Sequence, residues 1–170
     1  MVLNTVAIIG SFRQQYKAVL SAINSFTEAG LVVTSPLGTT ILENGVSFVR
    51  FESDPANWVN HHIQTVSLHR ILRADFVFVV APNGYVGKTT CYEVGRIVQA
   101  KRPVYFSSYP DDLPIYIPGE HIKTKEEIIA GINQGTFIAQ ALYVDPNIEA
   151  TKYEHDLLLG IYREDETFYQ

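Results

Sequence analysis

The sequence predicts an α/β fold in which a doubly wound parallel sheet carries helices on both faces, giving three layers, α/β/α. Short runs rich in Val, Ile and Phe alternate with longer stretches that have apolar residues at helical spacing. One run, FVFVV at residues 76–80, is apolar throughout, as expected for a central parallel strand covered on both faces. The length of 170 residues fits a single domain, residues 1–170, and no internal repeat divides it.

The first three elements lie in the N-terminal part of the chain. Residues 5–9 form an apolar run that ends in a Gly-Ser pair, which predicts a buried strand and a tight turn. Residues 14–29 carry apolar side chains at helical spacing, and Gly30 follows as a helix stop. Residues 31–34 then predict a second strand.

Residues 39–52 differ from the alternating pattern. Two runs with strand propensity, 40–42 and 46–51, flank an Asn-Gly pair at 44–45. An Asn-Gly pair between such runs is a strong signal for a β-hairpin. We therefore expect an antiparallel β-hairpin added to the main sheet.

The alternation of helices and strands resumes after this insertion. Apolar spacing predicts a helix over 57–73, then the central strand, then a helix over about 90–100 after a loop. The run PVYF at 103–106 predicts the next strand. Two further helices are predicted at 125–133 and 151–162. The last is amphipathic, so we expect it to pack on its own domain or at a subunit interface.

The composition excludes several classes of partner. The formal net charge is −5, which argues against binding to nucleic acid polymers or to anionic membranes. No apolar run approaches the roughly 20 residues of a membrane span, and the N-terminal run lacks the basic start of a signal peptide. The single cysteine, Cys91, forms no internal disulfide and fits a reducing compartment. We therefore expect a cytoplasmic protein.

Two loops that follow predicted strands carry the residues best suited to a ligand. Residues 10–13, Gly-Ser-Phe-Arg, can hold a phosphate or a sugar hydroxyl, or can form an ordinary turn; they are not a G-x-G-x-x-G fingerprint. Residues 81–90 contain two glycines that permit close backbone approach. Amides at 88–90 lie near a helix start, where anions are favoured. Phe12 and Tyr85 can sandwich a base, or belong to the core or a lid.

Glu93 is the side chain on which the chemical interpretation depends. It lies one turn into the predicted helix, where its carboxylate can point back into the cleft and attack an anomeric carbon. Two structural roles also fit: Thr90 and Glu93 form a T-x-x-E capping box, and Arg96 stands three residues further on. From spacing alone the capping role is favoured, because caps are far commoner than nucleophiles. The His and Cys residues lack the spacing of metal ligands, so no metal site is expected.

Three segments together resemble the nucleoside 2-deoxyribosyltransferase superfamily, which also contains 2′-deoxynucleoside 5′-phosphate N-hydrolases. They are AIIGSFR at 7–13, LHRILRADFVFVV at 68–80, and NGYVGKTTCYEVG at 83–95, continuing to KRPVYF at 101–106. The resemblance does not extend to the hairpin region or beyond Phe106. The Gly-Tyr-Val-Gly form of the loop is similar to the uncharacterised branch of the superfamily.

This resemblance implies a flavodoxin-like, Rossmann-like fold and a homo-oligomer, a dimer or higher. It implies that the protein is an enzyme in which Glu93 is the nucleophile that cleaves an N-glycosidic bond of a small nucleoside or nucleotide, which reverses the preference above. Hydrolysis and transfer to a second base both remain open, and no metal or organic cofactor is implied. The candidate substrate-binding residues of the two loops are Gly10, Ser11, Phe12, Arg13, Asn83, Gly84, Tyr85, Gly87, Lys88, Thr89 and Thr90.

Two positions depart from the family pattern. Family enzymes often carry acids that bind the sugar or handle the proton of the base at the positions where this chain has Ser67 and Tyr85. A non-catalytic nucleotide-binding or sensor module is therefore the alternative hypothesis. A structural interaction protein, with a cleft filled by its own side chains, is a third.

Overall fold

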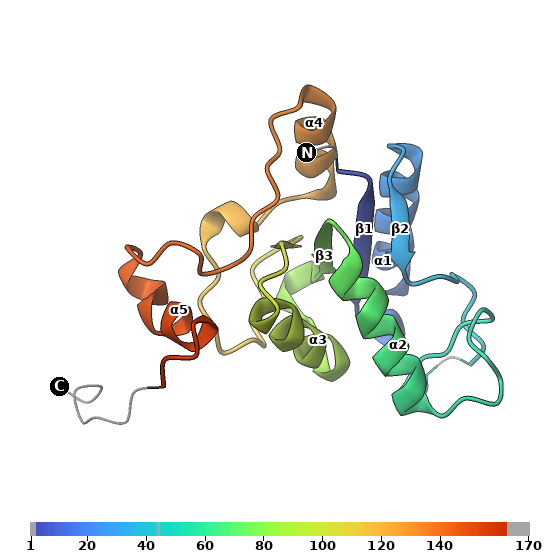
Figure 1. Ribbon diagram of the computed structural model, residues 1–170. Coiled ribbons are helices and arrows are strands. Elements are labelled where there is room, and N and C mark those ends of the chain that lie inside the picture. Colours follow the sequence, from blue (N-terminus) through green and yellow to red (C-terminus); the bar gives the residue numbers. More distant parts are fainter. Residues whose placement is uncertain (1–2, 44, 163–170) are drawn as a thin grey trace.

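The computed structural model describes residues 3–43 and 45–162, and it confirms the predicted α/β class (Figure 1). The strands form one parallel sheet in the order β2-β1-β3-β4. They are β1 (Thr5–Gly10), β2 (Val32–Ser35), β3 (Phe76–Val80) and β4 (Val104–Phe106).

Helices cover both faces of this sheet, so the three-layer arrangement is present. One face packs against α1 (Phe12–Glu28) and α4 (Lys125–Gln134). The other face packs against α2 (Asn60–Arg73) and α3 (Lys88–Gln99). The short helix α5 (Lys152–Leu158) lies beyond α3, at the side of the molecule away from β2 (Figure 1).

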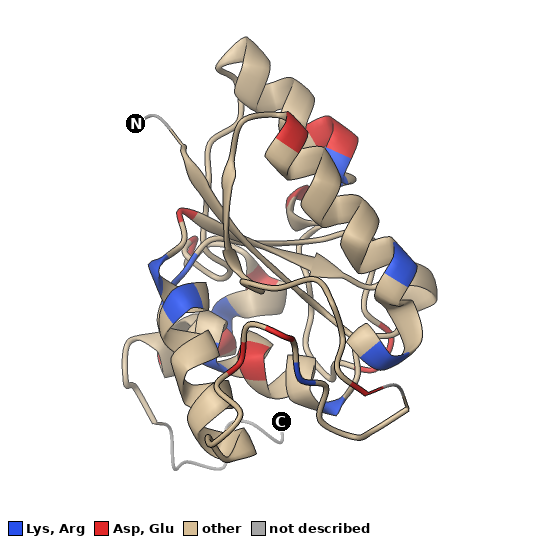
Figure 2. Cartoon of the chain, turned by 90° about the vertical axis from the view of Figure 1, so that its right-hand side faces the viewer, with Lys and Arg blue, Asp and Glu red and all other residues tan. Residues whose placement is uncertain are grey.

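Side chains of β1 point alternately to the two faces of the sheet, and each face has its own hydrophobic core. Val6 and Ile8 pack on the side of α1, whereas Ala7 and Ile9 pack on the side of α2 and α3. All five residues of β3 are buried, because this strand lies between two neighbours and under helices on both faces. Among the described residues, the charged ones accordingly lie on helices and loops and not on the strands (Figure 2).

The strand order creates a crevice at one edge of the sheet. The chain passes from β1 to β2 on one side and then returns to place β3 on the other side of β1. Loops that leave the carboxyl ends of β1 and β3 therefore diverge, and ligands of doubly wound sheets bind at such a switch point.

Helices α1, α2 and α3 start at positions other than those predicted. Helix α1 begins earlier, because the Ser11 hydroxyl accepts a hydrogen bond from the Gln14 amide (3.3 Å). Helix α3 begins before Thr90, because Gly87, with φ of 87°, is its N-cap. Helix α2 begins later, at Asn60.

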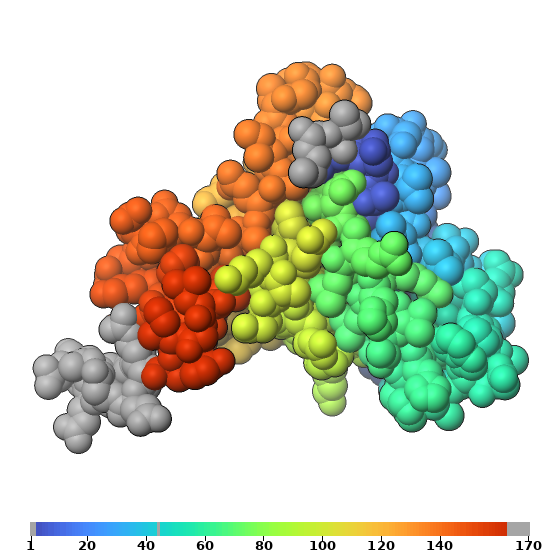
Figure 3. Space-filling view, viewed as in Figure 1, coloured from blue at the N-terminus to red at the C-terminus, as the bar shows by residue number. Residues whose placement is uncertain are grey.

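The C-terminal helix is shorter than the predicted 151–162. It ends at Leu158, because Gly160 takes a φ of 73° and the Ile161 amide turns back to the Asp156 carbonyl (2.9 Å). Leu158 packs on the core, and other apolar side chains of this segment are exposed. In Figure 3 this helix stands at one corner of the molecule, opposite β2. Among the described residues, no helix has the length and apolar character that crossing a membrane requires.

The inserted segment forms the predicted hairpin only in its shortest form. Ile41 and Phe51 make one antiparallel bridge, and no regular strand extends from it among the described residues. Asn44 of the predicted turn lies outside the described residues. The Leu42 amide donates to Arg50 (2.9 Å) beside that bridge. An isolated two-stranded hairpin has little stability of its own, and here the aromatic side chains of the segment turn toward the main domain instead.

Candidate functional site

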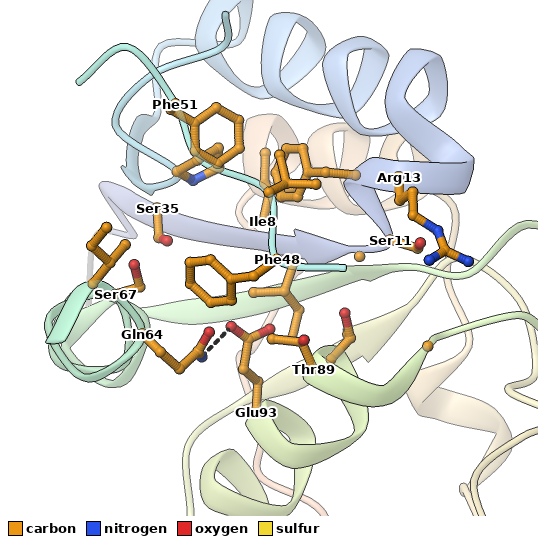
Figure 4. A pocket seen from close by; sticks show the side chains of 18 of the residues that line it. Ile8, Ser11, Arg13, Ser35, Phe48, Phe51, Gln64, Ser67, Thr89 and Glu93 are labelled. Atoms are coloured by element: carbon orange, nitrogen blue, oxygen red, sulfur yellow. Dashed lines mark hydrogen bonds between the residues drawn. The ribbon is translucent and has the colours of Figure 1, made fainter. Parts of the chain in front are cut away.

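A cavity of about 310 Å³ opens at the carboxyl edge of the sheet, at the switch point between β1 and β3 (Figure 4). Its walls come from the ends of β1 and β2, the inserted segment, α2, the loop before α3, and α3 itself. The volume lies at the lower end of the range for small-molecule sites. The cleft is therefore not filled by the protein's own side chains.

Most of the predicted site residues line this one cavity. The two predicted loops, distant in sequence, meet there with the first turns of α1 and α3. The lining includes Gly10, Ser11, Phe12, Arg13, Tyr85, Gly87, Lys88, Thr89, Thr90 and Glu93.

Asn83 and Gly84 are not part of the lining, contrary to the prediction. They lie in a short 3₁₀ turn, Pro82–Gly84, that packs against the segment at Asp111. The Gly84 carbonyl accepts a hydrogen bond from the Asp111 amide (2.9 Å), and a Cβ at Gly84 would collide with the Asp111 side chain. These two residues therefore serve the path of the backbone.

Glu93 faces the cavity and is buried, with 8% of its surface exposed. Its Oε1 accepts a hydrogen bond of 2.8 Å from Nε2 of Gln64 on α2 (Figure 4). The capping-box interpretation is wrong, because the helix starts earlier and its N-cap is Gly87. The alternative pair with Arg96 is not formed either, since that guanidinium donates to the Tyr92 hydroxyl (2.9 Å).

The electrostatics of Glu93 are those of an uncompensated buried acid. Burial raises its pKa from the ordinary 4.5 to about 7, and the hydrogen bond from Gln64 opposes that rise only in part. Within the described part of the chain, no cation forms an ion pair with this carboxylate. The ionised form of Glu93 is therefore held in a poorly solvated place, where a positive charge in a ligand would be strongly attracted.

The loop before α3 is fixed from behind by a side chain that the sequence did not indicate. The Asp112 carboxylate accepts hydrogen bonds from the amides of Val86 and Gly87, both at 3.0 Å. The next three amides, at 88–90, belong to the first turn of α3, where no acceptor within the helix is available. They lie at the cavity wall and suit an acceptor or an anion.

The chain approaches the cavity closely at the end of β1. A Cβ at Gly10 would lie 2.8 Å from the Val80 carbonyl oxygen, so a larger residue would push β1 from β3. Ser11 follows, and its hydroxyl oxygen already accepts the Gln14 amide as the cap of α1. Arg13 is exposed and lies beside Ser11 at the outer end of the cavity (Figure 4).

Aromatic side chains of the insertion form another wall. Phe12 and Phe51 pack edge to face, with ring centroids 4.8 Å apart. Figure 4 shows the ring of Phe48 projecting into the cavity above the Gln64–Glu93 pair. Neither Phe48 nor Phe51 was predicted to be a site residue, because nothing in the spacing of a loop says which side chains turn inward.

The two positions at which the resemblance led us to expect acids also lie at the site. Ser67 and Tyr85 both line the cavity, so no carboxylate is supplied from those positions. Asp54, two residues after the insertion, is the other acid of the described lining, and its Oδ2 accepts a hydrogen bond from the Phe51 amide (2.8 Å). Gln64 lies one turn before Ser67 on α2, and residues three apart on a helix share a face. Helical spacing from Ser67 could therefore have identified Gln64 as a site residue.

Comparison of the chain with family models, with curated proteins and with solved structures gave no match. Among the described residues, no group of three His, Cys, Asp or Glu side chains is arranged to hold a metal ion.

Proposed function

We propose that this protein cleaves the N-glycosidic bond of a nucleoside or nucleotide, with Glu93 as the nucleophile. One observation carries the proposal: Glu93 is a buried carboxylate on the wall of a ligand-sized cavity, and no cation among the described residues forms an ion pair with it. Breaking a C1′–N bond develops positive charge on the sugar ring. A carboxylate in a poorly solvated site stabilises that charge more than the neutral ground state, which is what lowers the barrier.

The reaction has two displacement steps. In the first, a Glu93 oxygen forms a bond to C1′ while the C1′–N bond breaks, and the electron pair leaves with the base nitrogen, which takes up a proton. In the second, water attacks C1′, the ester bond to Glu93 breaks, and the carboxylate is restored as the water loses a proton. The sum is nucleoside plus water giving free sugar and free base. Attack by the nitrogen of another base in the second step gives transfer.

The other lining groups support binding of the rest of the substrate. The amides at 88–90 suit a phosphate or sugar oxygen. The faces of Phe48 and Phe12 suit a base, since each ring lies at the cavity. A homo-oligomeric assembly and a cytoplasmic location stay predictions from the sequence.

Base release from a panel of nucleosides and nucleoside 5′-monophosphates, followed by chromatography, tests the proposal. Glu93→Gln should lower the rate by about 10³-fold or more, because the nucleophile is lost while the shape is kept. Glu126→Gln, an exposed change on α4, is the matched control and should leave the rate unchanged. Absence of base release above the Glu93→Gln background across the panel would reject the proposal.

The pH dependence gives a second test of the same proposal. Only ionised Glu93 can attack, and its pKa is raised to about 7. The value of kcat/KM should therefore rise tenfold per pH unit below 7 and level off above it. A profile already flat from pH 5 to 8 would contradict the role of this carboxylate.

A nucleotide-binding module without catalysis is favoured by one observation, the presence of Ser67 and Tyr85 in the lining where the family often has acids. Calorimetry separates the two functions. Tight binding of a nucleotide without turnover would support the module, whereas turnover that requires Glu93 would reject it.

A further inference from the structure

We infer that Gln64 is the residue that positions the nucleophile, holding one oxygen of Glu93 with a neutral donor so that the other oxygen is left to attack. This inference rests on the proposed function and adds a role for a residue of α2. It is carried by the geometry of one contact between two helices.

The contact joins groups that are far apart in the sequence. Gln64 Nε2 donates to Glu93 Oε1 at 2.8 Å, which is the length of a good hydrogen bond to a charged acceptor. The two residues stand 29 positions apart, so the hydrogen bond exists only because α2 and α3 pack side by side. Figure 4 shows the other carboxylate oxygen directed away from Gln64, toward Thr89. The hydrogen bond therefore fixes which oxygen is available to C1′.

The kind of donor matters as much as its position. A Lys or Arg at position 64 would neutralise the carboxylate and weaken its attraction for the positive charge of the transition state. An apolar residue would leave the carboxylate free to rotate and still harder to ionise. An amide orients the carboxylate and eases its ionisation without cancelling its charge. Gln64 thus keeps Glu93 both oriented and electrostatically uncompensated.

The surroundings of Gln64 are consistent with a side chain held at the site. Ile63, its neighbour on α2, is buried, and Ser67 lies one turn further along the same wall of the cavity. Gln64 itself lines the cavity and is only partly exposed. A side chain in that place reaches Glu93 from the wall of the cavity.

The test combines a titration that needs no substrate with steady-state kinetics. Protein labelled with ¹³C at the Glu side-chain carboxyls is titrated by NMR, and the Glu93 signal is assigned by its loss in Glu93→Gln. Gln64→Met keeps the length of the side chain but removes the donor. Thr65→Ala, at an exposed position of the same helix, is the matched control. Circular dichroism and thermal unfolding establish that each variant is folded.

We expect Gln64→Met to raise the titration midpoint of Glu93 by about one pH unit and to lower kcat roughly 10- to 100-fold, as loss of a hydrogen bond to a charged group does. The rising limb of the pH–rate profile should move by the same amount, while KM changes little. Gln64→Lys should move the midpoint below that of the wild type, because the ammonium favours the ionised carboxylate. It should still reduce kcat at pH 9, because the ammonium then compensates the negative charge of Glu93. Thr65→Ala should change neither quantity.

A midpoint in Gln64→Met equal to that of the wild type would overturn the inference, as would an unchanged pH–rate profile. A Gln64→Lys variant as fast as the wild type at pH 9 would overturn the argument for a neutral donor. If the wild type releases no base at all, the proposed function is rejected, and the titration still decides whether Gln64 holds the Glu93 carboxylate.

Discussion

Two acids at opposite edges of the sheet show how differently one chemical group can be used. Asp75 stands just before β3, at the amino edge. Its Oδ2 accepts hydrogen bonds from the Asn4 amide (2.8 Å), the Thr5 amide (2.9 Å) and the Thr5 hydroxyl (2.9 Å). Burial alone would raise the pKa of Asp75, but these donors and the charge of Arg102 outweigh burial and lower it.

Glu93, at the carboxyl edge, has the opposite balance. One neutral donor serves its carboxylate, and burial raises its pKa to about 7. Asp75 therefore joins β1 to the start of β3 and stabilises the fold as an anion, whereas Glu93 as an anion weakens it. Uncompensated groups of this kind concentrate at functional sites, where the cost to stability is retained for the sake of reactivity.

The largest effect on stability is expected from neutralising Glu93. Below pH 4.5 its carboxyl is protonated in both folded and unfolded chains, so it does not affect stability. Between pH 4.5 and about 7 the folded state binds the proton more tightly, so stability falls as pH rises and the loss is complete above 7. At about 1.4 kcal/mol per pKa unit the loss is about 3 kcal/mol. Glu93→Gln should recover it at pH 8.

Chemical denaturation at pH 4 and at pH 8 measures this effect. The variant should be more stable than the wild type at pH 8 and equal to it at pH 4. Equal stability at both values would show that Glu93 is not an uncompensated buried acid, and the comparison with Asp75 would fail.

A smaller effect of opposite sign is expected at the amino edge. Asp75→Asn removes the charge that three donors and Arg102 stabilise, and it should cost about 2 kcal/mol at pH 7. Because the pKa of Asp75 is lowered in the folded state, its contribution is present above its ordinary value of 3.8 and is lost as pH falls through the lowered pKa. Urea unfolding from pH 7 down to pH 2 should show the two proteins converge. An increase in stability on this substitution would contradict the structural role.

The smallest effect is expected from the partner of Asp75. Thr5 donates its hydroxyl to the carboxylate and accepts the Asp75 amide (2.9 Å) through the same oxygen. Thr5→Val keeps the shape of the side chain and removes both hydrogen bonds, so about 1 kcal/mol should be lost. Thermal unfolding at pH 7 checks this value. Base release should be unaffected, because Thr5 lies at the amino edge of the sheet and Glu93 at the carboxyl edge. A loss of activity in this variant would show that the two edges are not independent.

Much of the fold could be predicted from local pattern. The run at 76–80 is strand β3 with the predicted bounds, and α4 begins at Lys125 as predicted. Both elements are set by short-range interactions: β3 is a continuous apolar run, and the structure shows that a capping box of Thr124 and Glu127 starts α4. The hairpin was predicted from an equally local signal but is reduced to one bridge, because contacts of its aromatic side chains with the main domain decided its path.

The site was predicted only in part, because contacts between distant segments also decide which loop residues reach the cavity. Loops at the ends of parallel strands must meet at one edge, so Ser11 and Thr89 could be assigned to a common site from the sequence. Asn83 and Gly84 were assigned to it by proximity in sequence, and a 3₁₀ turn directs them elsewhere.

The sequence by itself determined the parallel sheet, its alternation with helices and the pair of loops at its carboxyl edge, because apolar periodicity and Gly-rich turns act over a few residues. Only the tertiary structure decided the state of Glu93. A pattern of T-x-x-E is the same in a cap and in a cavity wall, and the choice depended on where α3 begins and on which side chain of α2 lies opposite. Burial and hydrogen-bonding partners are properties of packing between distant segments, and they set the charge of a carboxyl group.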